Sequence, residues 1–104
     1  EKHCIPCEAG VKPYGSQEAE NMLENAPGWE LNENATQLHR VFKFKNFFRT
    51  MSFVNAIAHI ANQENHHPDI KLGYNYCDIT LTTHAIHGLS ENDFICAAKI
   101  NQLL

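Results

Sequence analysis

Hydrophobic positions recur along the chain with two periods, one typical of strands and one typical of helices. Residues 28–32 and 37–45 alternate hydrophobic with polar side chains, and a polar turn at 33–35 separates them, so a β-hairpin is predicted. Residues 70–74 and 77–82 alternate in the same way and predict a second hairpin.

Three other segments carry helix signals. Residues 16–25 are predicted to form a short helix with Ser16 as its N-cap. A long helix is predicted over 46–65, and a last helix runs from Ser90 to the chain end, with Asp93 at its third position as in a capping box. On these residues alone, helix capping accounts for Asp93 better than catalysis does.

The long helix is apolar on more than one side. Between Arg49 and Glu64 it has no Lys, Arg, Asp or Glu, so packing against a single sheet would leave apolar surface in water. We therefore expect it to contact both its own sheet and another subunit. Its two apolar stripes consist of Phe47, Met51, Val54, Ala58 and Ala61 on one side and of Phe53, Ile57 and Ile60 on the other.

The chain length fits one domain. A chain of 104 residues buries roughly 60 to 70% of its unfolded surface, which is enough for a hydrophobic core. Residues 1–15 are interrupted by Pro and Gly and predict an irregular N-terminal arm. Trp29 is expected to lie in the core and not to form a platform for a ligand.

Charge and hydropathy exclude two classes of function. The formal net charge is −4, and the Lys and Arg residues are mostly scattered, so direct binding to nucleic acid is not expected. No apolar run approaches the roughly 20 residues that span a bilayer. The expectation is a soluble cytoplasmic protein.

Cys4 and Cys7 form a C-x-x-C motif, which is typical of redox pairs and of half zinc sites. Neither role is favoured here, because the motif does not open a helix after a strand. Cys77 and Cys96, the other two cysteines, do not supply a second C-x-x-C pair.

The histidines supply the most concentrated chemistry in the chain. His66 and His67 precede Pro68, which disfavours a helical conformation at the residue before it, so the pair is predicted to leave the long helix at its C-terminal end. A turn at that point lets neighbouring side chains enter one cleft. Imidazole exchanges protons near neutral pH, and with His84 the pair suggests an active site for acid and base catalysis.

Two further roles for these histidines stay open. Any one of the seven histidines in the chain could be an ordinary surface or core residue. Three neutral imidazoles could also hold zinc, although adjacent ligands differ from the one-turn spacing usual on helices. The alternation of 77–82 directs His84 away from the helices unless the strand bends before Thr83.

Together these motifs resemble the pterin-4a-carbinolamine dehydratase family from about Trp29 to the chain end. The matching pieces, in order, are the triplet His66, His67 and Pro68, the hairpin with Tyr74, the strand end Thr82, Thr83 and His84, and the helix entry from Gly88 to Asp93. Cys4, Cys7 and Pro13 resemble the arm of bacterial members. Asn65 is a departure, because animal members commonly carry Asp there, so an orienting carboxylate is absent at this position.

The resemblance implies an α+β fold with a four-stranded antiparallel sheet and three helices on one face, in the order α-β-β-α-β-β-α. It also implies a homodimer or homotetramer, formed through helix 46–65 and a sheet edge. The implied substrate is 4a-hydroxytetrahydropterin, which aromatic amino acid hydroxylases produce. Dehydration gives quinonoid dihydropterin and water, and neither a metal nor an organic cofactor is required.

The resemblance also carries expectations for single residues. His66, His67 and His84 are the implied acid and base groups, with Asp93 as a supporting member of the catalytic set. The residues implied to bind substrate are Asn65, His66, His67, Pro68, Thr82, Thr83, His84 and Ala85. Two alternatives are a non-catalytic partner that stabilises another protein's dimer, as animal members of the family do, and a metal enzyme with histidine ligands.

Overall fold

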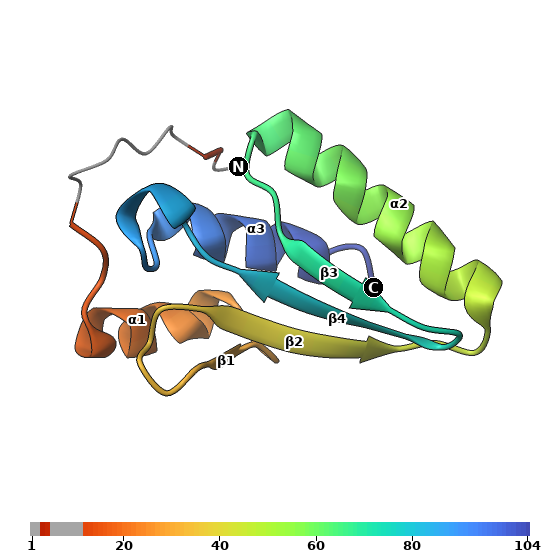
Figure 1. Cartoon of the computed structure of the whole chain (residues 1–104), viewed down its shortest axis with the longest axis horizontal. Helices are drawn as coiled ribbons and strands as arrows, with labels where there is room; N and C mark the ends of the chain where they lie inside the picture. The colour runs from red at the N-terminus through yellow and green to blue at the C-terminus, as the bar shows by residue number, and fades with distance from the viewer. Residues whose placement is uncertain (1–2, 5–11) are drawn as a thin grey trace.

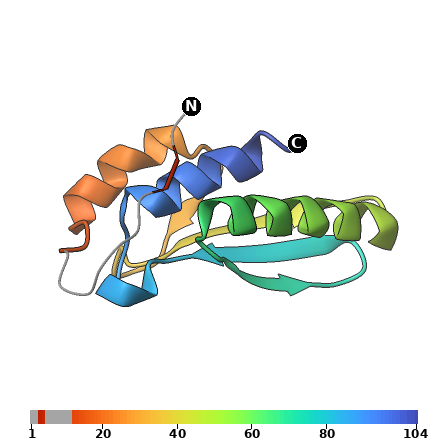
Figure 2. The ribbon, with the colours of Figure 1, turned by 90° about the horizontal axis from the view of Figure 1, so that it is seen from above.

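A four-stranded antiparallel sheet carries three helices on one of its faces (Figures 1 and 2). This computed structural model describes residues 3–4 and 12–104. The α-helices and strands are α1 (Ser16–Met22), β1 (Glu30–Leu31), β2 (Leu38–Lys43), α2 (Phe47–Glu64), β3 (Asp69–Leu72), β4 (Tyr76–Leu81) and α3 (Glu91–Asn101). Two short 3-10 helices are η1 (Leu23–Asn25) and η2 (His84–Ile86). The α+β architecture implied by the sequence is confirmed.

The order of strands in the sheet is β1-β2-β4-β3, so the two longer strands lie in the middle. Leu38 pairs with Leu81 and Phe42 with Cys77 across these central strands. All four side chains are buried, because alternate residues of a strand point to the same face of the sheet. The alternation in the sequence therefore predicted the buried face correctly.

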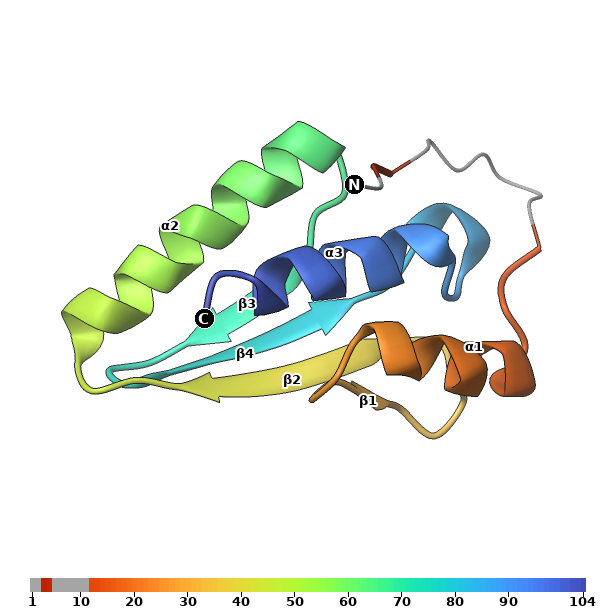
Figure 3. The same cartoon turned by 180° about the vertical axis from the view of Figure 1, so that it is seen from behind.

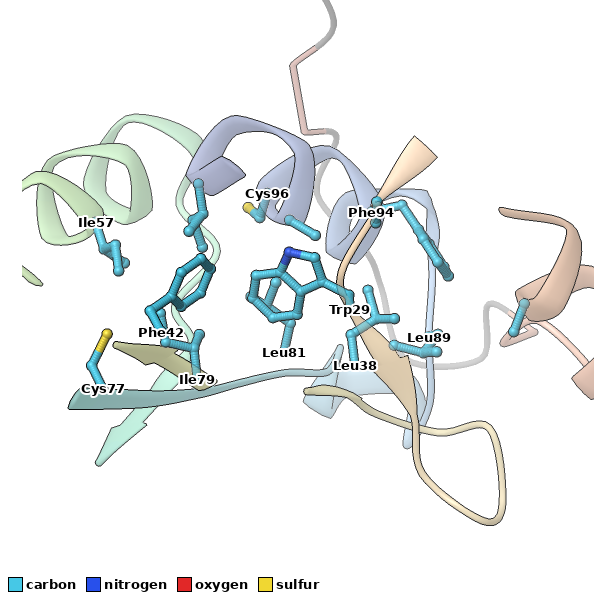
Figure 4. Packing of buried hydrophobic residues seen from close by; sticks show 14 of the residues in the cluster. Trp29, Leu38, Phe42, Ile57, Cys77, Ile79, Leu81, Leu89, Phe94 and Cys96 are labelled. Atoms are coloured by element: carbon cyan, nitrogen blue, oxygen red, sulfur yellow. The ribbon is translucent and has the colours of Figure 1, made fainter. Parts of the chain in front are cut away.

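The core lies between this face of the sheet and the helices, as Figure 4 shows. Trp29 is only 4% exposed and packs edge-on against Phe42, with 6.0 Å between ring centroids. Its indole N–H donates to the Asn101 side chain at 2.9 Å. Trp29 is thus a core residue, as expected.

The packing of α2 differs from the two predicted stripes. Phe53, Ile57 and Ala61 are buried, so members of both stripes form a single face against the sheet and α3. Phe47 and Phe48, at the start of the helix, are largely exposed. Ile57 therefore faces the core of its own domain.

Several predicted boundaries shift by a few residues. Gly15 and not Ser16 is the N-cap of α1, and the Gly15 N–H donates to the Glu18 carboxylate at 3.0 Å. Tyr74 lies in the turn between β3 and β4, outside the strand predicted for it, and α3 ends at Asn101 before the chain end. Fraying at element ends is the usual reason for such differences.

The described part of the N-terminal arm has no helix or strand and contacts the domain. The Tyr14 N–H donates to the Leu89 carbonyl at 2.9 Å, and the Cys4 N–H donates to the Glu64 carboxylate at 2.6 Å. Cys7, the second cysteine of the C-x-x-C motif, lies outside the described residues. Of the helices that the structure describes, none has the length and apolar character needed to cross a membrane.

Asn101 joins the end of α3 to the loop before β1, and we expect its loss to destabilise the fold. Its side-chain oxygen accepts from Trp29 and from Arg40, at 2.9 and 2.7 Å, and its amide donates to the Pro27 carbonyl. Asn101→Ala should lower the free energy of unfolding by about 1–3 kcal/mol, because the buried indole N–H loses its partner. Urea denaturation measures this loss. The neighbouring exposed Gln102→Ala is the control, and equal midpoints for the two variants would contradict the role of Asn101.

Candidate active site

The link between α2 and β3 presents the two adjacent histidines. Asn65 ends the helix in the left-handed conformation with φ of 50°, which Asn adopts more readily than most residues. The N–H groups of Asn65 and His66 both donate to the Ala61 carbonyl. The chain then turns through Pro68 into β3, so the predicted helix exit is confirmed.

The segment after β4 supplies the other residues of the site. Thr83 is buried and forms an isolated antiparallel bridge with Gly88, while the Thr82 hydroxyl donates to the Thr36 carbonyl at 2.7 Å. The chain then enters η2 at His84, whose side chain is exposed. The alternation of buried and more exposed side chains along β4 thus continues through Thr83, and the position of His84 depends on the turn at η2.

These two segments border a cleft of about 290 Å³. Its lining residues are Asn65, His66, His67, Thr82, Thr83, His84 and Ala85. Every residue implied to bind substrate is therefore in the lining except Pro68, which is half-buried next to it. A cleft of about 330 Å³ between η1 and α3 has neither histidine nor cysteine among its described lining residues, so imidazole chemistry concentrates in the smaller one.

Asp93 is fully buried behind this cleft, at 0% exposure. One carboxylate oxygen lies 2.6 Å from His66 Nε2. The other accepts from the Thr83 hydroxyl at 2.7 Å and from the Ser90 N–H at 3.0 Å. Because a carboxylate oxygen can only accept, His66 carries its proton on Nε2 and its ring orientation is fixed.

The same carboxylate therefore caps α3 and orients a histidine. The capping box predicted from Ser90 and Asp93 is present, so capping and a role at the site are compatible. Asp93 is not in the cleft lining, and it acts on the site through His66. Its geometry is that of a positioning residue, and its part in catalysis stays a prediction.

Two contributions were missed in the sequence. Thr83 lines the cleft, and its hydroxyl also donates to Asp93 and lies 2.8 Å from the Ser90 hydroxyl, contacts that the sequence did not predict. Glu64 was treated only as the end of an uncharged helix segment, yet it is buried and bonded to the N-terminal arm. A single acidic residue in an otherwise uncharged stretch was the available signal for such a role.

The three imidazoles do not converge on a common metal position. Within residues 3–4 and 12–104, no three His, Cys, Asp or Glu side chains are grouped so that they could hold a metal ion. His66 already uses Nε2 for Asp93, which leaves Nδ1 as its second nitrogen for proton exchange. The arrangement suits proton transfer at a cleft between two walls.

The sequence profile described as Pterin 4 alpha carbinolamine dehydratase matches residues 12–103. The chain belongs to the pterin 4 alpha carbinolamine dehydratase family. As a member it is an enzyme, a hydro-lyase by class. A relative from Nitrosomonas eutropha, named as a pterin-4-alpha-carbinolamine dehydratase, is 54% identical over 100% of this chain and 91% of its own length. A relative of the same name from Legionella pneumophila is 53% identical over 99% of this chain and 92% of its own.

Two solved structures share the fold of the family. A Brucella melitensis protein described as a transcriptional coactivator/pterin dehydratase has a TM-score of 0.83 and 32% identity, over 88% of this chain and 98% of that one. A pterin dehydratase-like protein described as a RuBisCO assembly factor has a TM-score of 0.65 and 25% identity, over 76% and 92%. The names of these two proteins thus include roles other than catalysis.

The contact with Asp93 predicts the tautomer of His66. We expect neutral His66 to carry its proton on Nε2, which the ¹⁵N shifts of the ring report directly. Asp93→Ala should abolish this preference and lower the free energy of unfolding by about 2–4 kcal/mol, since a cap and a buried acceptor are both lost.

Ser90→Ala is the control for the cap. It should cost about 0.5–2 kcal/mol of stability and leave the His66 tautomer unchanged. A proton on Nδ1 of neutral His66 in the unmodified chain would contradict the orientation by Asp93.

Proposed function

We propose that this chain dehydrates 4a-hydroxytetrahydropterin to quinonoid dihydropterin by acid and base catalysis with His66, His67 and His84. The observation that carries the proposal is the cleft that these three imidazoles share, in which a buried carboxylate fixes one ring. Membership of the dehydratase family supports the same reaction.

The chemistry needs one proton delivered and one removed. The bond between C4a and its hydroxyl oxygen breaks, and an imidazolium protonates the oxygen so that water leaves instead of hydroxide. A neutral imidazole takes the proton from N5, and the electrons of that N–H bond form the new double bond between N5 and C4a. Positioned acid and base groups of this kind typically contribute about 10²- to 10⁴-fold in rate.

The origin of the three imidazoles supports a division of labour. His66 and His67 come from the exit of α2 and His84 comes from η2, so imidazoles reach the cleft from two separate segments of the chain. We assign His67 to the N5 proton and His66 and His84 to hydroxyl groups that leave from opposite faces. Asn65, Pro68, Thr82, Thr83 and Ala85 would complete the pterin-binding surface.

The proposed physiological role is recycling of the tetrahydropterin cofactor of an aromatic amino acid hydroxylase, such as one that hydroxylates phenylalanine. Proton transfer between imidazole and substrate uses neither a metal nor an organic cofactor. Turnover should therefore survive full chelation. Loss of activity on chelation, with recovery on adding zinc, would instead favour a metal enzyme.

The epimers of the substrate separate the roles of the histidines. His67→Ala should lower turnover of both the 4aR and the 4aS carbinolamine, whereas His66→Ala and His84→Ala should each impair one epimer more than the other. The double variant should lose less than the sum of the single losses, since the members act as a unit.

Steady-state turnover of the separated epimers measures these effects. Equal losses for both epimers in every variant would contradict the division of labour. Full activity of the His66/His84 double variant would contradict the site itself.

A surface for association with further copies of the chain lies at the start of α2. The exposed Phe48, at 76%, lies with Phe47 at the start of α2, and the Thr50 hydroxyl joins this end of the helix to the turn that bears the exposed Tyr74. Exposed aromatic groups of this kind mark interaction surfaces. We propose that they contribute, with the edge of the sheet, to a homodimer or homotetramer.

If these exposed aromatic residues form the subunit interface, a charged side chain placed there should lower the mass of the assembly. Phe48→Lys should shift sedimentation toward the monomer without unfolding the domain, because the side chain is exposed. Ile57→Lys is not a suitable test, since Ile57 is buried in the core. Gln17→Lys, on exposed α1, is the control, and an unchanged mass for Phe48→Lys would exclude this interface.

A further inference from the structure

Glu64 is a buried carboxylate in an unfavourable position. It is the last residue of α2, directly before the link with the two histidines, and is only 8% exposed. A negative charge at the C-terminal end of a helix is disfavoured by the helix dipole, and burial removes its hydration. Such a group persists only where specific partners compensate for both effects.

The compensating partners come from the N-terminal arm and from α3. The Cys4 N–H donates to Oε1 at 2.6 Å, and His3 Nδ1 lies 2.9 Å from Oε2. The ammonium of Lys99 lies 3.5 Å from the same oxygen. In Figures 1 and 3 the described arm segment 3–4 lies beside the C-terminal end of α2.

These partners hold the charge on Glu64. The hydrogen bonds from Cys4 and His3, with the nearby Lys99 ammonium, outweigh burial and lower the pKa of Glu64 from 4.5 to about 2. The carboxylate is therefore ionised throughout the physiological pH range.

Cys4 also contacts the first turns of α3. Its thiol donates to the Asn92 carbonyl at 3.6 Å and lies 3.8 Å from the Cys96 sulfur. Asn92 directly precedes Asp93, the partner of His66. The arm thus bridges the last residue of α2 and the start of α3, and the bond between His66 and Asp93 joins the link directly after α2 to the same start of α3.

We propose that Glu64 is a positioning residue for the histidine pair and that residues 3–4 act as a latch on it, holding the exit of α2 against the start of α3. This inference rests on the proposed dehydratase function. It assigns a role in the reaction to a residue outside the cleft and to the N-terminal arm. Release of the latch lets the α2 exit move relative to Asp93, and misplacement of about 1 Å can cost on the order of 10²-fold in rate.

Kinetics of three variants test the positioning role. Glu64→Ala removes the contacts that the latch makes with the α2 exit and should lower kcat at least 10-fold with KM changed less than 3-fold. Glu64→Gln keeps an acceptor for the Cys4 N–H and should recover most of the lost kcat.

Thr50→Ala is the matched control, because Thr50 is a buried polar residue at the other end of α2. It should destabilise the helix and leave kcat within 2-fold. Equal losses of kcat in Thr50→Ala and Glu64→Ala would mean that the loss in Glu64→Ala comes from lower stability of the fold, and this result would overturn the proposal.

Thiol alkylation tests the latch without any turnover. In a Cys7→Ser background Cys4 is the single thiol of the arm, and Glu64→Ala should raise its rate of alkylation by iodoacetamide at least 10-fold. Glu64→Gln should raise it less. An unchanged rate for Glu64→Ala would show that Glu64 does not hold the arm.

The two measurements also separate this inference from the proposed function. If the unmodified chain lacks dehydratase turnover, the proposed function fails. The latch is then tested by the alkylation rate of Cys4 and by the tautomer of His66. In Glu64→Ala, neutral His66 should carry its proton partly on Nε2 and partly on Nδ1. Retention of the tautomer in that variant would overturn the positioning role.

The lowered pKa of Glu64 sets the pH dependence of the latch. A carboxyl group whose pKa is depressed on folding stabilises the fold above its unfolded value, and this contribution is lost as pH falls through the folded value. The groups that face it are His3 and the Cys4 N–H of the arm, and Lys99 and Cys96 of α3.

The stability difference between the unmodified chain and Glu64→Gln should therefore be full above pH 4.5 and shrink toward pH 2. Thermal unfolding across this range measures it. A difference that stays constant down to pH 2 would contradict an ionised Glu64 in the latch.

Discussion

The hydrogen bond between His66 and Asp93 is the constraint on which the site depends. It joins the exit of α2 to the first turn of α3 across 27 residues of sequence, and it places the carboxylate beneath the cleft and out of water. A buried charge with three hydrogen-bond partners is held rigidly, so the imidazole above it has one orientation and one tautomer. The chemistry proposed for the cleft follows from that fixed ring.

The sheet supplies the second half of the site. The central pair of strands fixes the end of β4, and the chain continues through the bridge between Thr83 and Gly88 into η2, where His84 lines the same cleft as His66 and His67. Thr83 belongs to both systems, because its backbone completes the bridge and its hydroxyl binds Asp93. Thr83 therefore links the central sheet to the carboxylate that positions His66.

Local signals in the sequence were sufficient for the order of the elements and for the helix exit that bears His66 and His67, but not for the position of His84. Pro68 predicts the helix exit, and the pair Ser90 and Asp93 predicts the start of α3, since both effects act within a few residues. The contact of Asp93 with His66 and that of Glu64 with the arm join positions far apart in the sequence, and no periodicity encodes them. The sequence also left open which side of α2 meets the sheet, because an apolar helix does not reveal it, and the structure buries Phe53 and Ile57 of one stripe together with Ala61 of the other.

The central claim is that imidazoles in this cleft dehydrate the carbinolamine. Stopped-flow absorbance with freshly generated 4a-hydroxytetrahydropterin tests it most directly, with the spontaneous dehydration in the same buffer as the reference. The account predicts an acceleration of at least about 10²-fold that does not need added metal. A rate equal to the spontaneous one, with a correctly folded chain, would contradict it.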